Sequence, residues 1–131
     1  MKSFTFFILL FITCLNGLKS QTSFSCTYRQ YCYWNDNVKI FQNCKGFEEN
    51  SLFVVSKDEA SFTHVIETMK NTFSVKERQY DKETDVWTYH VTSAEGTKYT
   101  YSFDPRNKEI RLVPDKEEKT VMQIFTINSI Y

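Results

Sequence analysis

The sequence predicts an α+β domain in which one amphipathic helix packs on an antiparallel meander of four to five strands. Three observations predict it: an apolar stripe at helical spacing after Ser56, strict alternation of apolar and polar residues from Val86, and turn sequences that bring three strands onto one aromatic face. A cysteine-bearing hairpin segment at residues 24–44 precedes these elements. The striped helix and the apolar sheet face are expected to bury each other as two adjoining layers.

The predicted helix covers residues 56–72. Ser56 is a good N-cap, Asp58 and Glu59 place negative charge at the positive end of the helix dipole, and Glu59 occupies the capping-box position. The apolar stripe that follows at helical spacing consists of Phe62, Val65, Ile66, Met69 and Phe73. We therefore expect one face of this helix to lie on the sheet.

The clearest predicted strand is residues 86–92, in which apolar and polar side chains alternate. A hairpin turn follows at residues 93–97, where Gly96 is free to take a positive φ. Pairing across that turn places opposite one another Trp87 and Phe103, Tyr89 and Tyr101, and Val91 and Tyr99. These residues are expected to share one aromatic face of the sheet.

A second turn, residues 104–107, carries proline at the second position of a type I turn. Its register places Tyr101 beside Ile110 and Tyr99 beside Leu112, again on the aromatic face. The last predicted strand, residues 121–127, is apolar on both faces, so we expect it to be covered on both sides or to lie against another chain. One further strand of the meander is predicted at residues 75–80, before the strand at 86–92.

The first twenty residues follow the order of a signal peptide. Lys2 supplies a positive charge, an apolar run of roughly a dozen residues follows, and small and polar residues then lead to Ser20. The run is shorter than the about 20 residues that a membrane-spanning helix needs. The sequence therefore predicts cleavage after Ser20, with Gly17 as the alternative, and a single secreted, extracellular domain at residues 21–131.

Charge argues against two classes of partner. The chain has 16 basic and 16 acidic side chains, and removal of Lys2 and Lys19 with the signal peptide lowers the basic count to 14, for a net charge of −2. Proteins that bind nucleic acids or anionic membranes present a basic surface to them. We therefore expect neither as a main partner, and an extracellular protein or a small ligand instead.

Cysteine counting predicts one disulfide and one remaining thiol. Cys14 is lost with the signal peptide, which leaves Cys26, Cys32 and Cys44 in an oxidising compartment. A hairpin centred on residues 35–36 would place Cys26 nearly opposite Cys44, so we expect that pair. Cys32 would then be buried or would link two chains as a disulfide-bonded dimer.

Two sets of residues are candidates for function. The aromatic segment is either a binding patch or part of the core, and it consists of Tyr28, Tyr31, Tyr33 and Trp34. His90 is the weak candidate for a catalytic base, because it projects from the polar sheet face opposite Thr100, with Glu77 or Arg78 on the neighbouring strand. The alternative is an ordinary solvated sheet face. The three cysteines lack a C-x-x-C spacing, so neither a metal site nor a cofactor is expected.

The order of elements, a strand or loop, then one helix, then an antiparallel meander, resembles the cystatin-like architecture and the later part of nuclear-transport-factor-2-like folds. The resemblance implies layout only, because the Q-x-V-x-G hairpin of cystatins does not occur in this sequence. Protease inhibition is therefore not carried over.

These observations favour a non-enzymatic extracellular binding module. Two alternatives stay open: a small ribonuclease-like hydrolase that uses the polar face around His90, and a carrier that encloses a small ligand between the helix and the aromatic face. The sequence contains no phosphate-binding loop and no G-x-S-x-G or H-E-x-x-H motif.

Overall fold

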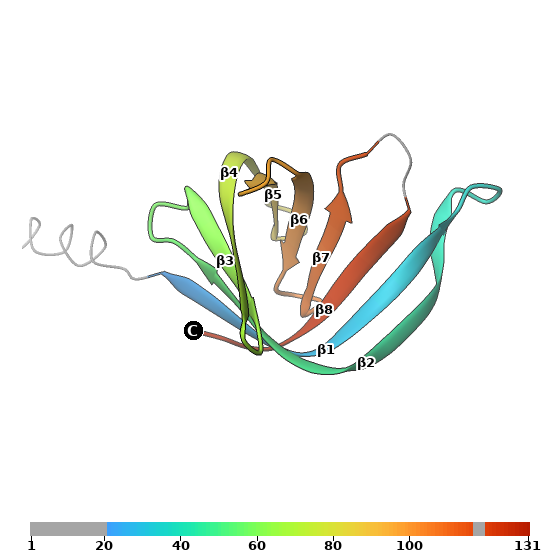
Figure 1. The fold of residues 1–131 in the computed structure, drawn as a ribbon, viewed down its shortest axis with the longest axis horizontal. Coiled ribbons are helices and arrows are strands. Elements are labelled where there is room, and N and C mark those ends of the chain that lie inside the picture. The colour runs from blue at the N-terminus through green and yellow to red at the C-terminus, as the bar shows by residue number, and fades with distance from the viewer. Residues whose placement is uncertain (1–20, 117–119) are drawn as a thin grey trace, which may run out of the picture.

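Eight antiparallel strands follow one another around a closed barrel in the computed structural model, which describes residues 21–116 and 120–131 (Figure 1). Each strand pairs with the next, and the last pairs with the first, so no sheet edge runs the length of the barrel. The strands are β1 (Thr22–Asn35), β2 (Ile40–Val55), β3 (Ser61–Ile66), β4 (Met69–Asp81), β5 (Val86–Ser93), β6 (Lys98–Asp104), β7 (Glu109–Pro114) and β8 (Val121–Ile130). The predicted signal peptide lies outside the described residues.

The α+β prediction is wrong, because the expected helix at residues 56–72 is a β-hairpin. Phe62 and Phe73 belong to the proposed helical stripe, but they lie directly opposite each other on β3 and β4. A separation of eleven residues fits both one helix face and this cross-strand pair. Met69, a third member of the stripe, is 64% exposed at the start of β4. β-branched residues between the two phenylalanines favour the strand, and closure of the barrel decides between the two interpretations.

The polar residues taken for a helix cap form the turn between β2 and β3. The hydroxyl of Ser56 donates to Asp58 Oδ1 (2.7 Å), and the same oxygen accepts the backbone N–H of Ala60 (3.0 Å). Glu59 has a φ of 57°, in the left-handed region, which stops a helix from continuing. In the next hairpin turn, between β3 and β4, Glu67 likewise has a left-handed backbone conformation, with a φ of 49°. Asp and Ser favour such local turns as readily as helix caps.

The meander from β5 to β7 agrees with the predicted aromatic face. All three predicted pairs between β5 and β6 are confirmed, including Tyr89 opposite Tyr101. Between β6 and β7 the register differs by two residues, so that Tyr101 lies opposite Leu112 and Phe103 lies opposite Ile110. A shift of two residues keeps every side chain on its face. The face lines the interior of the barrel and needs no helix to cover it.

The disulfide joins Cys32 to Cys44, and Cys26 is a buried free thiol. This corrects the predicted Cys26–Cys44 pair, and it leaves Cys32 no sulfur for a link to a second chain. The hairpin turn lies at residues 36–39, later than predicted, so Cys26 lies opposite Ser51. A bulge in β2, where Asn43 takes a φ of 55° and residues 43 and 44 lie opposite Cys32, brings Cys44 alongside Cys32.

The β1–β2 hairpin extends beyond the barrel wall. β2 pairs with β3 only from Ser51 to Val55, whereas its residues 40–50 pair with β1 alone. Figure 1 shows this extension, which we call the arm, reaching away from the other hairpins. The arm therefore extends one side of the barrel beyond its rim.

Aromatic side chains fill the interior, and one end of the barrel is plugged. Phe53, Phe62 and Phe103 are almost fully buried and meet edge to face, with ring centroids 5.8–6.0 Å apart. At the end with the 56–60 turn, the Tyr89 hydroxyl donates to Glu59 Oε1 (2.9 Å). The same carboxylate pairs with Arg78. We call this the closed end.

No helix long and apolar enough to cross a membrane is found among residues 21–116 and 120–131.

Candidate functional site

The opposite end of the barrel holds a cavity of about 510 Å³, which we call the mouth. This volume lies in the range of about 300–1,000 Å³ that is typical of small-ligand sites. Polar residues of β1–β4 and β8 meet apolar and aromatic residues of β3, β4, β6 and β7 in its wall. The lining residues are Arg29, Tyr31, Glu49, His64, Ile66, Glu67, Thr68, Met69, Asn71, Phe73, Tyr99, Tyr101, Leu112 and Gln123.

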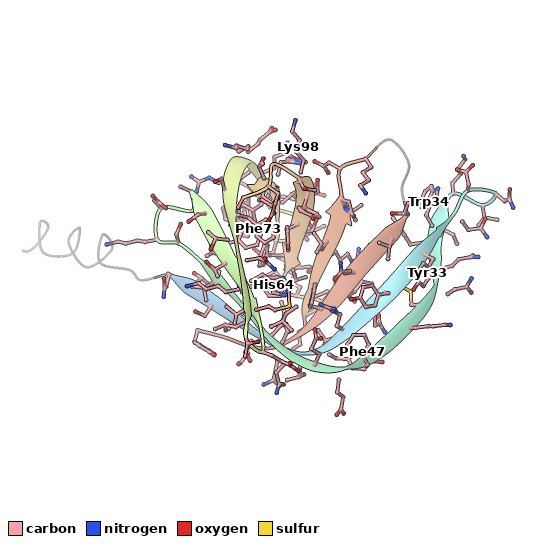
Figure 2. All side chains as sticks on the ribbon, in the orientation of Figure 1. Tyr33, Trp34, Phe47, His64, Phe73 and Lys98 are labelled. Atoms are coloured by element: carbon pink, nitrogen blue, oxygen red, sulfur yellow. A yellow bond between two sulfur atoms is a disulfide. The ribbon has the colours of Figure 1, made fainter. Side chains whose placement is uncertain are left out.

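His64 lies at the inner limit of the mouth, where the polar wall meets the aromatic core (Figure 2). Its side chain points inward from β3 and is 5% exposed. The imidazole stacks on Phe53 (centroids 4.0 Å apart) and meets Phe125 edge to face (5.0 Å). Its Nε2 atom is buried and has no hydrogen-bond partner in the described protein. An unsatisfied buried polar atom costs about 1–3 kcal/mol, so it is a strong candidate for a ligand contact.

His64 is uncharged at neutral pH. Burial, and to a smaller extent the positive charge of Arg29, lower the pKa of the imidazole to about 4. A neutral imidazole has one N–H donor and one nitrogen acceptor. His64 can therefore offer a ligand either a donor or an acceptor without carrying a charge.

An ion pair between β1 and β2 forms the side of the mouth nearest the arm. Arg29 Nη1 and Glu49 Oε1 lie 3.2 Å apart, with side chains only 15% and 17% exposed. Arg29 also donates to the Tyr31 hydroxyl. Its guanidinium carbon lies 5.0–5.6 Å from the ring centroids of Tyr31, Phe47 and Phe125. These contacts hold the guanidinium group in one place.

The Arg29–Glu49 pair has unused hydrogen-bonding capacity. Arg29 Nε and Glu49 Oε1 are both buried, and neither has a hydrogen-bond partner among the residues that the structure describes. The contact between the two side chains is thus an ion pair by distance without the alignment of a hydrogen bond. Three buried polar atoms without partners therefore belong to mouth residues, because His64 contributes the third.

The predicted aromatic segment does not form one patch. Tyr31 alone of its four members lines the mouth. Tyr28 lies across Gly46 on the neighbouring strand, so closely that a β-carbon there would clash with its phenol ring. Tyr33 is 48% exposed on the arm, and Trp34 packs on Phe41 at 5.0 Å (Figure 2).

His90 is on the outer face of β5, opposite Thr100 and Glu77 as predicted. Its Nδ1 lies 3.1 Å from the Thr100 hydroxyl, which donates to Asp115 Oδ1 (2.6 Å). A hydroxyl that gives its one proton to a carboxylate must accept from the imidazole, so Nδ1 carries the proton. The lining of the mouth does not include His90.

The buried thiol of Cys26 is unreactive. Burial raises its pKa to about 12, although a hydrogen bond with Ser51 acts in the opposite direction. The thiolate is the nucleophile and the metal ligand, so this cysteine packs as a small apolar residue. Within residues 21–116 and 120–131, no group of three or more His, Cys, Asp and Glu side chains is placed to hold a metal ion.

Sequence reasoning missed the mouth because it depends on a bulge in β1 and on the unpredicted β3–β4 hairpin. A bulge between Cys26 and Tyr28 changes which β1 residues face inward, so that Arg29 and Tyr31 join the interior. His64 lies on β3, within the residues for which the sequence predicts a helix. The one available signal was Arg29, which is the single charged residue of the aromatic-rich strand β1.

Comparison with known proteins found no protein family, no curated protein and no solved structure that matches this chain, so the functional argument rests on the geometry of the mouth.

Proposed function

We propose that this chain is a non-enzymatic binding protein that holds a small ligand in the mouth of its barrel. The observation that carries the proposal is the buried His64 Nε2, which lacks a hydrogen-bond partner beside a cavity of about 510 Å³. A barrel that only needed stability would place an apolar side chain at this position, because a buried polar atom without a partner is destabilising.

The packing below the mouth limits the size of the ligand. Phe53, Phe62 and Tyr101 fill the barrel beneath His64, and each is at most 1% exposed. The Tyr89–Glu59 hydrogen bond closes the far end. The ligand is therefore a compact molecule seated above the aromatic core, with an apolar part against Leu112 and a polar part near His64.

We further propose that the protein acts outside the cell. The Cys32–Cys44 disulfide supports this, because such bonds persist in oxidising compartments. The signal-peptide pattern of residues 1–20 supports the same compartment. Sequencing the N-terminus of the exported protein tests it, with Gln21 expected as the first residue and an intact Met1 as the contrary result.

Nuclear magnetic resonance of the mature chain tests ligand binding. The experiment titrates residues 21–131, with labelled imidazole and methyl groups, with the neutral aromatic probe 2-phenylethanol. We expect saturable shifts of the His64 ring and the Leu112 methyl groups, because both residues line the mouth. The Val55 methyl groups at the closed end are the internal control. Equal shifts at Val55 and Leu112, or no shift at His64, would contradict the proposal.

A second candidate is a small ribonuclease-like hydrolase at His90. The hydrogen-bond chain through Thr100 to Asp115 favours it, because this chain orients the His90 ring through Nδ1 and keeps Nε2 out of the Thr100 contact. Assays of RNA and ester turnover by the wild type and by His90→Ala separate the two candidates. Turnover that is lost in His90→Ala supports the hydrolase, and a wild type without turnover eliminates it.

A further inference from the structure

We propose that the ligand of the mouth is a free α-amino acid with an apolar side chain. This inference rests on the proposed function, since it names the chemical class of the ligand for the same cavity. It is argued from the Arg29–Glu49 pair, from the three buried polar atoms without partners, and from the apolar surface beside them.

Arg29 and Glu49 present one positive and one negative charge side by side in the wall of the mouth, and Glu67 of the β3–β4 turn adds a second negative charge. Arg29 and Glu49 are 3.2 Å apart and largely shielded from water. A ligand with a single charge would satisfy one of them and leave the other facing a like charge or no partner, which is unfavourable at a buried position. A zwitterion carries both complementary charges on one carbon atom, so it can satisfy both residues at once.

The unused hydrogen-bonding positions match the two groups of a zwitterion. Arg29 Nε is a donor without an acceptor, and Glu49 Oε1 is an acceptor without a donor. A ligand carboxylate accepts from Arg29, while a ligand ammonium group donates to Glu49. Both atoms are buried while the ion pair is closed, so binding exchanges the protein's own ion pair for two pairs with the ligand.

The remaining wall of the mouth favours an apolar side chain. Leu112, Phe73 and Tyr101 line it together with the uncharged His64. An apolar side chain placed there leaves water, which favours binding in proportion to the apolar area buried.

Three probes of similar shape test the inference on the mature chain by titration calorimetry. L-phenylalanine carries both charges, 2-phenylethylamine lacks the carboxylate, and 3-phenylpropionate lacks the ammonium group. We expect L-phenylalanine to bind about ten- to a hundredfold more tightly than either, which corresponds to the loss of one charged hydrogen bond. An amine or an acid that binds as tightly as L-phenylalanine would overturn the inference.

The neutral probe separates this inference from the proposed function. If 2-phenylethanol shifts the His64 resonances but L-phenylalanine gains nothing over its two analogues, the mouth binds ligands and the assignment to amino acids is wrong. If none of the four probes binds at the mouth, both proposals fail.

A matched pair of variants assigns the effect to the ion pair. Glu49→Gln removes the partner of the ammonium group, so L-phenylalanine should lose its advantage over 3-phenylpropionate. Glu48→Gln makes the same charge change on the neighbouring, exposed residue and should leave the ratio unchanged. An unchanged ratio in Glu49→Gln contradicts the inference. Should Glu49→Gln fail to fold, the comparison of probes on the wild type decides the question.

Discussion

Replacing His64 with phenylalanine isolates the effect of burying a neutral imidazole in the barrel. The pKa of His64 is about 4 in the folded protein and 6.5 in the unfolded chain. Below pH 6.5 the unfolded chain therefore binds a proton that the folded protein does not, so stability falls as the pH falls and levels off below pH 4. The two pKa values predict a loss of about 2 kcal/mol between pH 7 and pH 5, and about 3 kcal/mol by pH 4.

Phenylalanine does not titrate, so His64→Phe removes this part of the pH dependence. At pH 7 the variant should be about 1 kcal/mol more stable than the wild type, because an apolar ring replaces a buried polar atom without a partner. The same variant should lose affinity for ligands of the mouth. This opposition between stability and binding is typical of functional sites.

Urea denaturation at pH 7 and pH 5 measures the effect for the wild type, His64→Phe and the control His90→Gln. The control removes the other histidine, which lies on the outer face, and should keep the pH dependence of the wild type. If the wild type and His64→Phe lose equal stability between pH 7 and pH 5, His64 is not buried in its neutral form and the reasoning fails.

Three further substitutions test the fold. Replacing Cys32 and Cys44 with serine should lower the free energy of unfolding by about 2–4 kcal/mol, as measured in urea, since their disulfide closes a loop with a sequence separation of 12; no change would mean that the bridge is not formed. Gly46→Ala should destabilise the arm by about 1–3 kcal/mol because the added methyl group meets Tyr28, and Tyr28→Ala should relieve this in a double-mutant cycle, whereas additive effects would contradict the contact. Tyr89→Phe should cost about 1 kcal/mol through loss of the hydrogen bond at the closed end, and an unchanged melting temperature would exclude that bond.

The parts of the fold that were predicted correctly are those in which neighbouring strands meet through short turns. In β5 and β6, the alternation of apolar and polar residues gives the inward face, and the short turn at Gly96 gives the register. Together they predict the pairing of Tyr89 with Tyr101. In β7 the face was right although the register was two residues off, because the 105–108 turn contains Lys108 with a positive φ. Local information was sufficient there.

The remaining elements depend on contacts between distant segments. The spacing of Phe62 and Phe73 fits both a helix face and a hairpin, and closure of the barrel decides for the hairpin, which the intervening β-branched residues also favour. The mouth depends on a bulge in β1 that turns Arg29 inward, and neither alternation nor composition marks its position. Sequence reasoning therefore could not place the polar interior, although the single charge of Arg29 in β1 pointed to it.

The most direct test of the account is a titration of the mature chain with L-phenylalanine, monitored at the His64 imidazole and the Leu112 methyl groups. The account predicts saturable shifts at both residues, no shift of the Val55 methyl groups, and tighter binding than for 2-phenylethylamine or 3-phenylpropionate. A His64 resonance that stays in place when each of the four probes, 2-phenylethanol included, is added to excess in turn would contradict the claim that the mouth is a binding site.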